Sequence, residues 1–351
     1  MNINLLKKKP FFIAEISANH CGSINIAKKL IQDAKKYGAD AVKFQTFTPE
    51  TMTLNSNKKD FQIKNGIWKG NNLWNIYKLA QTPYEWHKEL FSYCRKKKII
   101  CLSTPFDETA VDFLETLQCP IYKISSFEMT DLPLIAKVAK TKKPIIMSTG
   151  MADLKEIEIS YNVAKKNGAK EIILLYCVSN YPSKVFDFNL KNIQILKKKF
   201  KCRVGLSDHS KDNIIAKLAI ASGADIIEKH IALKNKPKSL DYNFSVKGRE
   251  ILQFRQDINL AYNLIGKNKF YRSKEELKNR KFRRSIYIAK DISAGEKFLK
   301  SNLKKVRPGG GVNPIYYKKI LGKKAFKNFK AGSPITLNDL KRLKIKRILI
   351  Y

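Results

Sequence analysis

The sequence predicts an α/β fold: a closed (β/α)8 barrel followed by a small β-rich C-terminal domain. Three observations indicate it. Short apolar, β-branched runs alternate with longer amphipathic stretches over roughly the first 230 of the 351 residues. Such alternation is typical of βαβ units with parallel strands. Eight strands in succession favour a closed barrel over an open sheet. After residue 266 the composition changes to a charged segment and then to a repeated, turn-rich tail.

The strands are expected where apolar runs are shortest and richest in β-branched residues, at 11–17, 41–45, 99–103, 121–124, 144–148, 171–178, 203–206 and 224–229. Helices are expected between them, for example at 24–37, 83–98, 109–117, 154–167 and 213–222. Gly38, Gly168 and Gly223 each precede an Ala and a polar residue just before a predicted strand, where a glycine can end a helix.

The connection after the second predicted strand, residues 48–81, is unusually long for a βα loop. It contains Trp68, Trp74 and Tyr77 among several Gly and Asn residues. Long loops at the carboxyl ends of barrel strands often cover a substrate, and an ordinary surface insertion is the alternative.

The predicted domains are a barrel over residues 1–266, a linker over 267–284 and a C-terminal domain over 285–351. The last repeats itself at a spacing of 37 residues: Lys290, Ala294, Gly295 and Leu303 recur as Lys327, Ala331, Gly332 and Leu340. This predicts two similar β-rich units. Between them, Arg307 and Pro308 precede three glycines, a loop that can hold one Arg in place while another chain approaches closely.

Composition indicates an intracellular globular protein. No apolar stretch approaches the roughly 18 residues of a membrane span. The N-terminal residues 1–10 are basic, but Glu15 interrupts the apolar run that follows, unlike a signal peptide. The six cysteines include no Cys-x-x-Cys pair, which favours a reducing compartment. We therefore expect a cytoplasmic protein without membrane association.

The formal net charge of +39 raises the possibility of nucleic-acid binding. The Lys residues are spread in short runs, at 28–29, 35–36, 96–98 and 197–199, which is typical of solvated helix faces. No zinc-finger or RNA-binding signature accompanies them. We expect no nucleic-acid partner, although a basic nucleic-acid-binding protein remains the alternative from another functional class.

All eight predicted strands end in polar residues, and reactive groups of such barrels collect at these ends. Lys43 and Lys123 lie at the ends of two of the strands. Hydroxyl groups also lie at strand ends, at Thr104, Ser126, Ser148, Ser179 and Ser207. Two ammonium groups among hydroxyl donors suit a small, multiply charged phosphate or carboxylate. For either Lys alone, an ion pair with a neighbouring Glu is the alternative.

Two of the four histidines, His209 and His230, close the seventh and eighth predicted strands, which are neighbours. Converging imidazoles that leave other positions open make a plausible catalytic site for a divalent metal. Hydrogen-bonded core histidines are the alternative. His20 lies in the first loop, and His87 lies on a predicted helix, where a structural role is expected.

Several motifs, in order and in register, resemble the sialic (nonulosonic) acid synthases over nearly the whole chain: residues 13–20, 42–46, 103–106, 148–151, 205–209 and 228–230. The tail looks like the antifreeze-like (SAF-type) domain of that family, including Arg307, Pro308 and Gly309. Residues 16–20, 82–87 and 107–114 look closest to the pseudaminic acid synthase branch. Cys21 departs from the family, which usually places Asn there.

The resemblance implies that phosphoenolpyruvate condenses with an N-acetylated amino sugar, 2,4-diacetamido-2,4,6-trideoxy-L-altrose, with loss of phosphate by C–O cleavage. It implies that His209 and His230 bind a divalent ion, Mn²⁺ before Mg²⁺ or Co²⁺. It assigns phosphoenolpyruvate to Lys43, Thr104, Lys123, Ser126, Ser148, Ser179 and Ser207. It assigns the sugar to Gln45, Tyr181, Asp241 and Arg307, the last contributed by the tail of a partner subunit in a domain-swapped homodimer.

Glu15 is the expected group that orients or deprotonates the attacking water, and Glu228 is a weaker candidate for proton handling or for support of the metal ligands. The nearest alternative function is an N-acetylneuraminate or legionaminate synthase that uses N-acetylmannosamine or a related diacetamido sugar. Another is a tail that acts alone as a binding module.

Overall fold

The computed structural model describes residues 10–266 and 268–348, so the basic segment 1–9 lies outside the described residues. The chain divides into two compact units, with the boundary between Gly266 and Lys267. In the described part of the chain, no helix combines the length and the apolar character needed to cross a bilayer.

The first unit is a TIM barrel, as the sequence predicts. Eight parallel strands pair in chain order and β1 pairs with β8 to close the ring: β1 (Phe11–Glu15), β2 (Ala41–Thr46), β3 (Ile100–Pro105), β4 (Tyr122–Ile124), β5 (Ile145–Ser148), β6 (Ile172–Cys177), β7 (Arg203–Asp208) and β8 (Ile226–Ala232). A two-residue strand, β9 (Val246–Lys247), extends β8. His230 therefore lies within the last barrel strand, which runs three residues beyond its predicted end.

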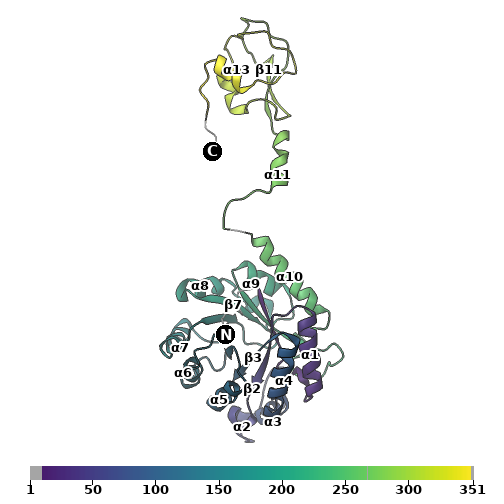
Figure 1. Ribbon diagram of the computed structural model, residues 1–351, viewed down its shortest axis with the longest axis vertical. Helices are drawn as coiled ribbons and strands as arrows, with labels where there is room; N and C mark the ends of the chain where they lie inside the picture. The colour runs from purple at the N-terminus through teal and green to yellow at the C-terminus, as the bar shows by residue number, and fades with distance from the viewer. Residues whose placement is uncertain (1–9, 267, 349–351) are drawn as a thin grey trace. The chain divides into compact units, whose positions relative to one another are not determined.

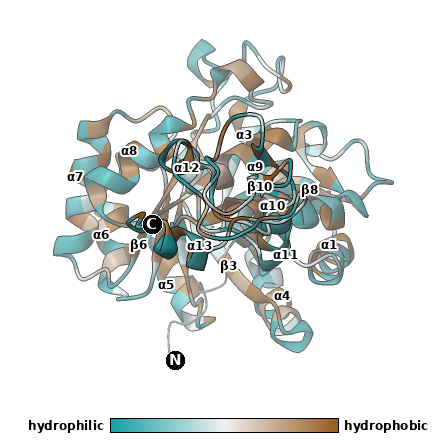
Figure 2. Ribbon diagram, turned by 90° about the horizontal axis from the view of Figure 1, so that it is seen from above, coloured by the Kyte–Doolittle hydropathy of each residue, from teal (hydrophilic) through white to brown (hydrophobic). Residues whose placement is uncertain are grey.

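A helix follows each strand and covers the outside of the barrel (Figure 1): α1 (Ile24–Lys36), α4 (Tyr84–Lys97), α5 (Glu108–Thr116), α6 (Leu132–Lys140), α7 (Leu154–Lys166), α8 (Lys191–Phe200), α9 (Ile214–Ala221) and α10 (Glu250–Ile265). In Figure 2, α6, α7 and α8 show mixed hydrophobic and hydrophilic colouring, as amphipathic helices do.

Local sequence explains where these helices begin and end. Asp153 caps α7 by accepting hydrogen bonds from the backbone N–H groups of Lys155 and Glu156, and Glu156 closes a capping box. At the other end, Lys runs occupy the last turns of α1, α4 and α8, where cations complement the helix dipole. Part of the basic charge therefore lies at helix ends.

The period-two alternation of the strands creates two layers of core. Phe11, Ile13 and Ile226 belong to a cluster inside the barrel, whereas Phe12 and Ala14 belong to the larger cluster between strands and helices. Gly205 has an inward position in β7, where an added Cβ would lie 2.2 Å from the carbonyl oxygen of Ile226. Side chains that continue the inward series beyond the apolar layer emerge at the carboxyl end of the barrel.

The insertion at residues 48–81 is folded rather than a plain loop. It contains α2 (Pro49–Met52), a 3-10 turn η2 (Lys59–Phe61) and α3 (Leu73–Ala80), and a β-bridge pairs Gln62 with Asn72. Asn72 also caps α3 and donates from Nδ2 to the carbonyl of Ser56, at 3.0 Å.

The second unit has a core of its own, built around Ile286, Phe298 and Ile335. Its named elements are β10 (Ser285–Ile288), antiparallel to β11 (Leu303–Val306), and the short helices η6 (Pro314–Tyr316), α12 (Tyr317–Ile320) and α13 (Leu337–Arg342). The predicted repeat is visible in the two turns at Gly295 and Gly332, which have φ of 89° and 80°. It ends differently, because Leu303 begins a strand whereas Leu340 lies in α13. The segment 267–284, expected as a linker, contains α11 (Lys274–Lys278) and the 3-10 turn η5 (Asn279–Phe282).

Candidate active site

A cavity of about 470 Å³ opens at the carboxyl end of the barrel and gathers most of the predicted site residues. Its lining includes Lys43, Gln45, Lys123, Ser126, Ser148, Tyr181, Ser207, His209, Glu228, His230 and Asp241. Glu15, Thr104 and Ser179 lie directly behind this lining, in contact with it or with its neighbours. The convergence of two lysines and two histidines that the sequence indicates is therefore present in the structure.

Strand register places the charged groups side by side. In the parallel ladders, Glu15 pairs in register with Lys43 on β2 and with His230 on β8. Each inward side chain follows an inward core residue by two positions, as Lys43 follows Ala41 and Glu228 follows Ile226. The same alternation that fills the barrel core thus delivers the polar residues to one rim.

Lys43 forms the centre of a buried charge cluster. Its Nζ lies 2.5 Å from Glu15 Oε2 and 3.7 Å from Glu228 Oε1, and it donates to Thr104 Oγ1 at 3.2 Å. Burial alone would lower the pKa of Lys43, but the Glu15 and Glu228 carboxylates raise it above its usual value. Lys43 is therefore a fixed cation, and the predicted alternative of an ion pair with Glu is also realised in this structure.

Lys123 lies on β4, and its Nζ donates to Ser148 Oγ at 2.6 Å and to the carbonyl of Ile124 at 3.1 Å. Its nearest carboxylate oxygen, Glu228 Oε1, is 4.0 Å away. Burial lowers the pKa of Lys123, and the Glu228 charge offsets this only in part. An anion bound in the cavity would stabilise the charged form, so the site favours an anionic ligand.

Two carboxylate oxygens in the cluster lack a hydrogen-bond partner among the described residues, Glu15 Oε1 and Glu228 Oε2. Burial raises the pKa of Glu15 against the opposing charge of Lys43. For Glu228 burial acts in the same direction, but Lys123 and Lys43 together hold its pKa below the usual value. Two neighbouring carboxyl groups whose pKa values are shifted in opposite directions are suited to different roles in proton transfer.

Ser126 and Ser179 meet at the backbone of Gly150. The N–H of Gly150 donates to Ser126 Oγ at 3.1 Å, and a Cβ at this position would lie 2.1 Å from Ser179 Oγ. Only glycine allows both hydroxyls to approach so closely. Ser207 donates to Glu228 Oε1 at 3.3 Å, so this hydroxyl is held within the same network.

The imidazoles of His209 and His230 lie edge to face with centroids 5.3 Å apart. His209 Nδ1 is 3.2 Å from the carbonyl oxygen of Val178, and His230 Nδ1 is 3.4 Å from Asp241 Oδ2. The hydrogen bond to Val178 fixes the His209 ring and leaves its Nε2 as the ligating atom, as in many metal sites, whereas His230 Nδ1 lies near Asp241 without a hydrogen bond among the described residues.

Two imidazoles that converge on the cavity are chemically suited to a divalent ion whose other positions are left to substrate and water. In residues 10–266 and 268–348, no group of three or more His, Cys, Asp or Glu side chains could by itself hold a metal ion. The metal site therefore stays a prediction that rests on His209 and His230.

The predicted sugar residues are divided between the two units. Gln45, Tyr181 and Asp241 line the cavity, and the Tyr181 ring lies 4.4 Å from that of His209. Asp241 is held by Asn19, whose Oδ1 accepts from the Asp241 N–H at 3.1 Å. Arg307 lies exposed in the second unit, directly after β11, so its role in sugar binding stays a prediction.

Sequence reasoning missed the buried ion pair behind the histidines. Lys229 Nζ lies 2.9 Å from Asp208 Oδ2, and both side chains face away from the barrel interior. Each residue directly precedes a histidine, so the pair ties the ends of β7 and β8 together. The sequence did offer a signal: at the end of each of these neighbouring strands, one charged residue stands between two inward-facing site residues.

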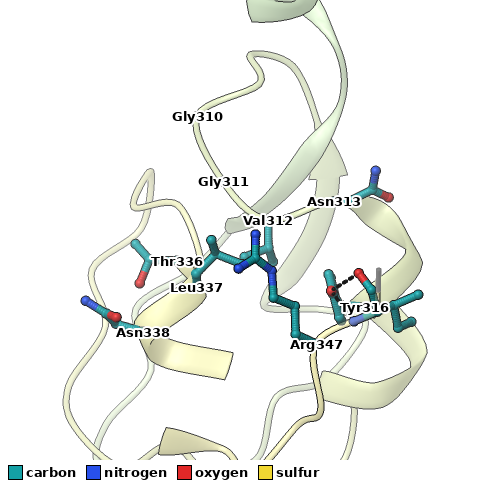
Figure 3. Close-up of a pocket in the computed structure, with 10 residues that line it drawn as sticks. Gly310, Gly311, Val312, Asn313, Tyr316, Thr336, Leu337, Asn338 and Arg347 are labelled. Atoms are coloured by element: carbon teal, nitrogen blue, oxygen red, sulfur yellow. Dashed lines mark hydrogen bonds between the residues drawn. The ribbon is translucent and has the colours of Figure 1, made fainter. Parts of the chain in front are cut away.

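A second cavity, of about 610 Å³, lies in the C-terminal unit (Figure 3). It is lined by Gly310, Gly311, Val312, Asn313, Tyr316, Thr336, Leu337, Asn338, Arg347 and Ile348. This described lining contains none of the predicted site residues and no carboxylate, so the barrel cavity is the candidate active site.

Comparisons with known proteins identify the family of this chain. The NeuB family model matches residues 30–270, and the SAF domain model matches residues 283–341. The pseudaminic acid synthase of Campylobacter jejuni is 43% identical over 332 residues, which cover 95% of this chain and 97% of that protein.

Other similar proteins are named as synthases of related acidic sugars. The N,N'-diacetyllegionaminic acid synthase of Campylobacter jejuni is 41% identical, covering 92% of this chain and 98% of that protein. The crystal structure of N-acetylneuraminic acid (sialic acid) synthetase from Leptospira borgpetersenii, in complex with citrate, has a TM-score of 0.70 at 32% identity and covers 78% of this chain and 90% of that one. The chain belongs to the NeuB family, as an enzyme of the nonulosonic acid synthase class in which a TIM barrel is followed by a SAF domain.

Proposed function

We propose that this enzyme is a pseudaminic acid synthase, which condenses phosphoenolpyruvate with the open-chain form of 2,4-diacetamido-2,4,6-trideoxy-L-altrose. The observation that carries the proposal is the meeting of Lys43, Lys123, His209 and His230 in one cavity. The 43% identity to a pseudaminic acid synthase over 95% of the chain supports the choice of sugar.

Phosphoenolpyruvate occupies the polar floor of the cavity. Lys43 and Lys123 bind its phosphate and carboxylate, and the hydroxyls of Thr104, Ser126, Ser148, Ser179 and Ser207 supply further donors. In support, both ammonium groups are buried and fixed by neighbours before any ligand enters. Prior orientation of this kind reduces the entropy lost on binding.

His209 and His230 would hold the divalent ion, Mn²⁺ before Mg²⁺ or Co²⁺, which supplies Lewis-acid polarisation of the aldehyde oxygen when bound. Asp241 and the Val178 carbonyl orient the two imidazoles for this purpose. The edge-to-face contact of Phe244 with His230, with centroids 4.9 Å apart, restricts that ring further.

The chemical steps place Glu15 at the attacking water. C3 of phosphoenolpyruvate forms a bond to the aldehyde carbon, water adds to C2, and the C2–O bond to phosphate breaks. The water oxygen becomes the new ketone oxygen, and its two protons end on the sugar hydroxyl and on the released phosphate. Glu15 accepts the first proton, since a buried carboxylate with a raised pKa is a stronger base than an exposed one. Glu228 stays ionised and balances the two lysines.

The sugar lies above this floor, against Gln45, Tyr181 and Asp241. Arg307 of the partner subunit would reach it from the SAF domain of a domain-swapped homodimer. A cytoplasmic location is consistent with six cysteines that all remain free thiols.

Position-specific labelling tests the bond that breaks. Phosphoenolpyruvate carrying ¹⁸O at the bridging oxygen should deliver the label to inorganic phosphate, because the C–O bond is cleaved. Mass spectrometry of the phosphate measures this directly. Label retained in the nine-carbon product would refute water attack at C2 and the role of Glu15 with it.

A second candidate function is supported by one observation. The identity to an N,N'-diacetyllegionaminic acid synthase, 41%, is nearly as high as that to the pseudaminic acid synthase. A legionaminate synthase would use the same floor chemistry and differ in the stereochemistry of the sugar.

A further inference from the structure

Helix α3 carries an apolar face that is not packed into either hydrophobic core of the barrel. Leu73, Ile76, Tyr77 and Ala80 lie at i, i+3, i+4 and i+7, the spacing of one helix face. None of the four is fully buried, and all four line the active-site cavity. The face that would normally seal a helix onto a protein core is therefore directed at the space where substrate binds.

Neighbouring apolar side chains extend this face into a wall. Phe47, Met52, Ile63 and Phe106 line the same cavity. The Phe47 ring lies edge to face with the Tyr77 ring at 5.8 Å and with the Phe106 ring at 5.2 Å. The cavity thus has a charged floor, made by the barrel strands, and an apolar wall, made largely by the insertion at 48–81.

The wall is held in a defined place. Asn72 begins α3 as its cap and bonds to the Ser56 carbonyl, and the bridge to Gln62 closes the insertion on itself. On the barrel side, the Trp68 ring packs against the Tyr181 ring at 5.9 Å. An apolar surface fixed in this way can discriminate between ligands by shape and polarity.

The chemistry of the floor sets which end of the sugar faces the wall. The aldehyde carbon C1 must lie at the lysine and histidine groups, because it reacts there. The far end of the open chain, carrying C6, then extends away from the charged floor. A methyl group at C6 can be buried against apolar side chains, whereas a hydroxyl there would lose its hydrogen bonds to water.

We propose that the apolar face of α3, with Ile76 at its centre, is the specificity-determining surface that selects a 6-deoxy amino sugar over its 6-hydroxy counterpart. This inference rests on the proposed function. It adds that the insertion between β2 and α4, rather than the catalytic floor, chooses the sugar at this position.

Paired substrates and paired variants test the inference. The substrates are 2,4-diacetamido-2,4,6-trideoxy-L-altrose and its 6-hydroxy counterpart, which differ by one hydroxyl. Ile76→Asn places an amide in the wall. Leu79→Asn makes the same change on the outer face of the same helix, where Leu79 is 63% exposed. For each variant, kcat/KM is measured with both sugars, together with the KM for phosphoenolpyruvate.

The wild-type enzyme should prefer the 6-deoxy sugar by about 10- to 100-fold, the range expected for one such difference in an apolar pocket. Ile76→Asn should bring this ratio close to one while the KM for phosphoenolpyruvate stays within about twofold of wild type. Ile76→Leu should restore the preference. Leu79→Asn should keep the wild-type ratio, which separates recognition from a general effect on the helix.

Other outcomes overturn the inference in distinguishable ways. An unchanged ratio in Ile76→Asn, or equal changes in both Asn variants, removes α3 from substrate selection. A change in sedimentation with the ratio retained would show that the face binds a second copy of the chain instead. If the wild-type enzyme forms no product from the 6-deoxy sugar, the proposed function itself fails, whatever the variants do.

Discussion

At the scale of single residues, the account depends most on Glu15. Its Oε1 lacks a hydrogen-bond partner among the described residues, whereas Oε2 lies 2.5 Å from Lys43 Nζ. Glu15→Gln should lower kcat by about 10²- to 10⁴-fold, the usual contribution of a general base. Phosphoenolpyruvate binding, measured by calorimetry, should persist. Glu158→Gln, which changes an exposed carboxylate paired with Lys199, is the control. Full activity of Glu15→Gln would remove Glu15 from the mechanism.

The buried pair of Lys229 and Asp208 should matter for stability as well as for the site. Lys229→Met leaves Asp208 as an uncompensated charge between strands and helices, so the free energy of unfolding should fall by about 3–5 kcal/mol. Urea denaturation measures the change. Lys330→Met, which breaks an exposed pair with Asp291, should leave the midpoint almost unchanged. Equal losses of unfolding free energy in the two variants would mean that the buried pair does not stabilise the fold.

Buried histidines outside the candidate metal site should make the fold sensitive to acid. Burial lowers the pKa of both His20 and His87 to about 4, from 6.5. Between these values the unfolded chain binds more protons than the native one, so stability falls as pH is lowered through this window. From pH 7 to pH 5 each histidine should reduce the unfolding free energy by about 2 kcal/mol.

His87→Gln isolates one of these contributions. Gln can still bond to Thr46 and Pro83, which lie 2.8 and 3.0 Å from the His87 ring nitrogens, but it does not titrate. The variant should therefore lose less stability than wild type between pH 7 and pH 5 in thermal melts. Parallel losses in the two proteins would contradict the assignment of His87 as a neutral buried group.

The alternation of inward and outward side chains along each strand explains how much of the site could be predicted. Inward positions follow from period-two alternation, so Lys43, Lys123 and Glu228 could be placed at one rim from the sequence alone. The hydrogen bonds that fix them could not, because partners such as Ser148 and Thr104 depend on register between neighbouring strands. The Asp208–Lys229 pair was missed for the same reason.

At the scale of elements, β7 and β8 present the two imidazoles that are expected to bind metal. Dialysis against a chelator should abolish turnover, and added Mn²⁺ should restore it. His209→Ala should weaken Mn²⁺ binding, measured by calorimetry, whereas His87→Gln should not. Unaltered activity after complete metal removal would eliminate the proposed role of the ion.

The elements themselves were predictable to different degrees. The eight strands were predicted because β-branched runs between amphipathic stretches are a strong local signal. The insertion at 48–81 was expected as a long loop, whereas it forms α2 and α3. Helix α3 has only eight residues, and its apolar face lines a cavity, so its pattern could not be separated from that of a surface loop.

At the scale of the whole molecule, a domain-swapped homodimer would place Arg307 of the partner subunit over the sugar. Arg307→Ala should raise the KM for the sugar with little effect on that for phosphoenolpyruvate, and deletion of residues 285–351 should inactivate the enzyme. Lys304→Ala, a nearby exposed change on β11, is the control. An active barrel without its C-terminal domain would instead favour a tail that works as a separate binding module.

Mixed dimers test the exchange itself. Glu15→Gln and Arg307→Ala chains are each expected to be impaired, but a swapped hybrid combines an intact Glu15 with an intact Arg307 at one of its two sites. Mixing and refolding the two variants should therefore recover part of the wild-type activity. No recovery from a mixture shown to contain hybrids would mean that each barrel uses its own Arg307 or none.

The central claim is that the cavity at the barrel rim joins phosphoenolpyruvate to a diacetamido-trideoxyhexose. The most direct measurement is mass spectrometry of the products formed from phosphoenolpyruvate and a panel that contains stereoisomeric diacetamido-trideoxyhexoses and N-acetylmannosamine. We predict a nine-carbon acid and equimolar phosphate from the L-altro sugar, with far slower turnover of the others. A preference for N-acetylmannosamine, or no condensation with any member of the panel, would contradict the account.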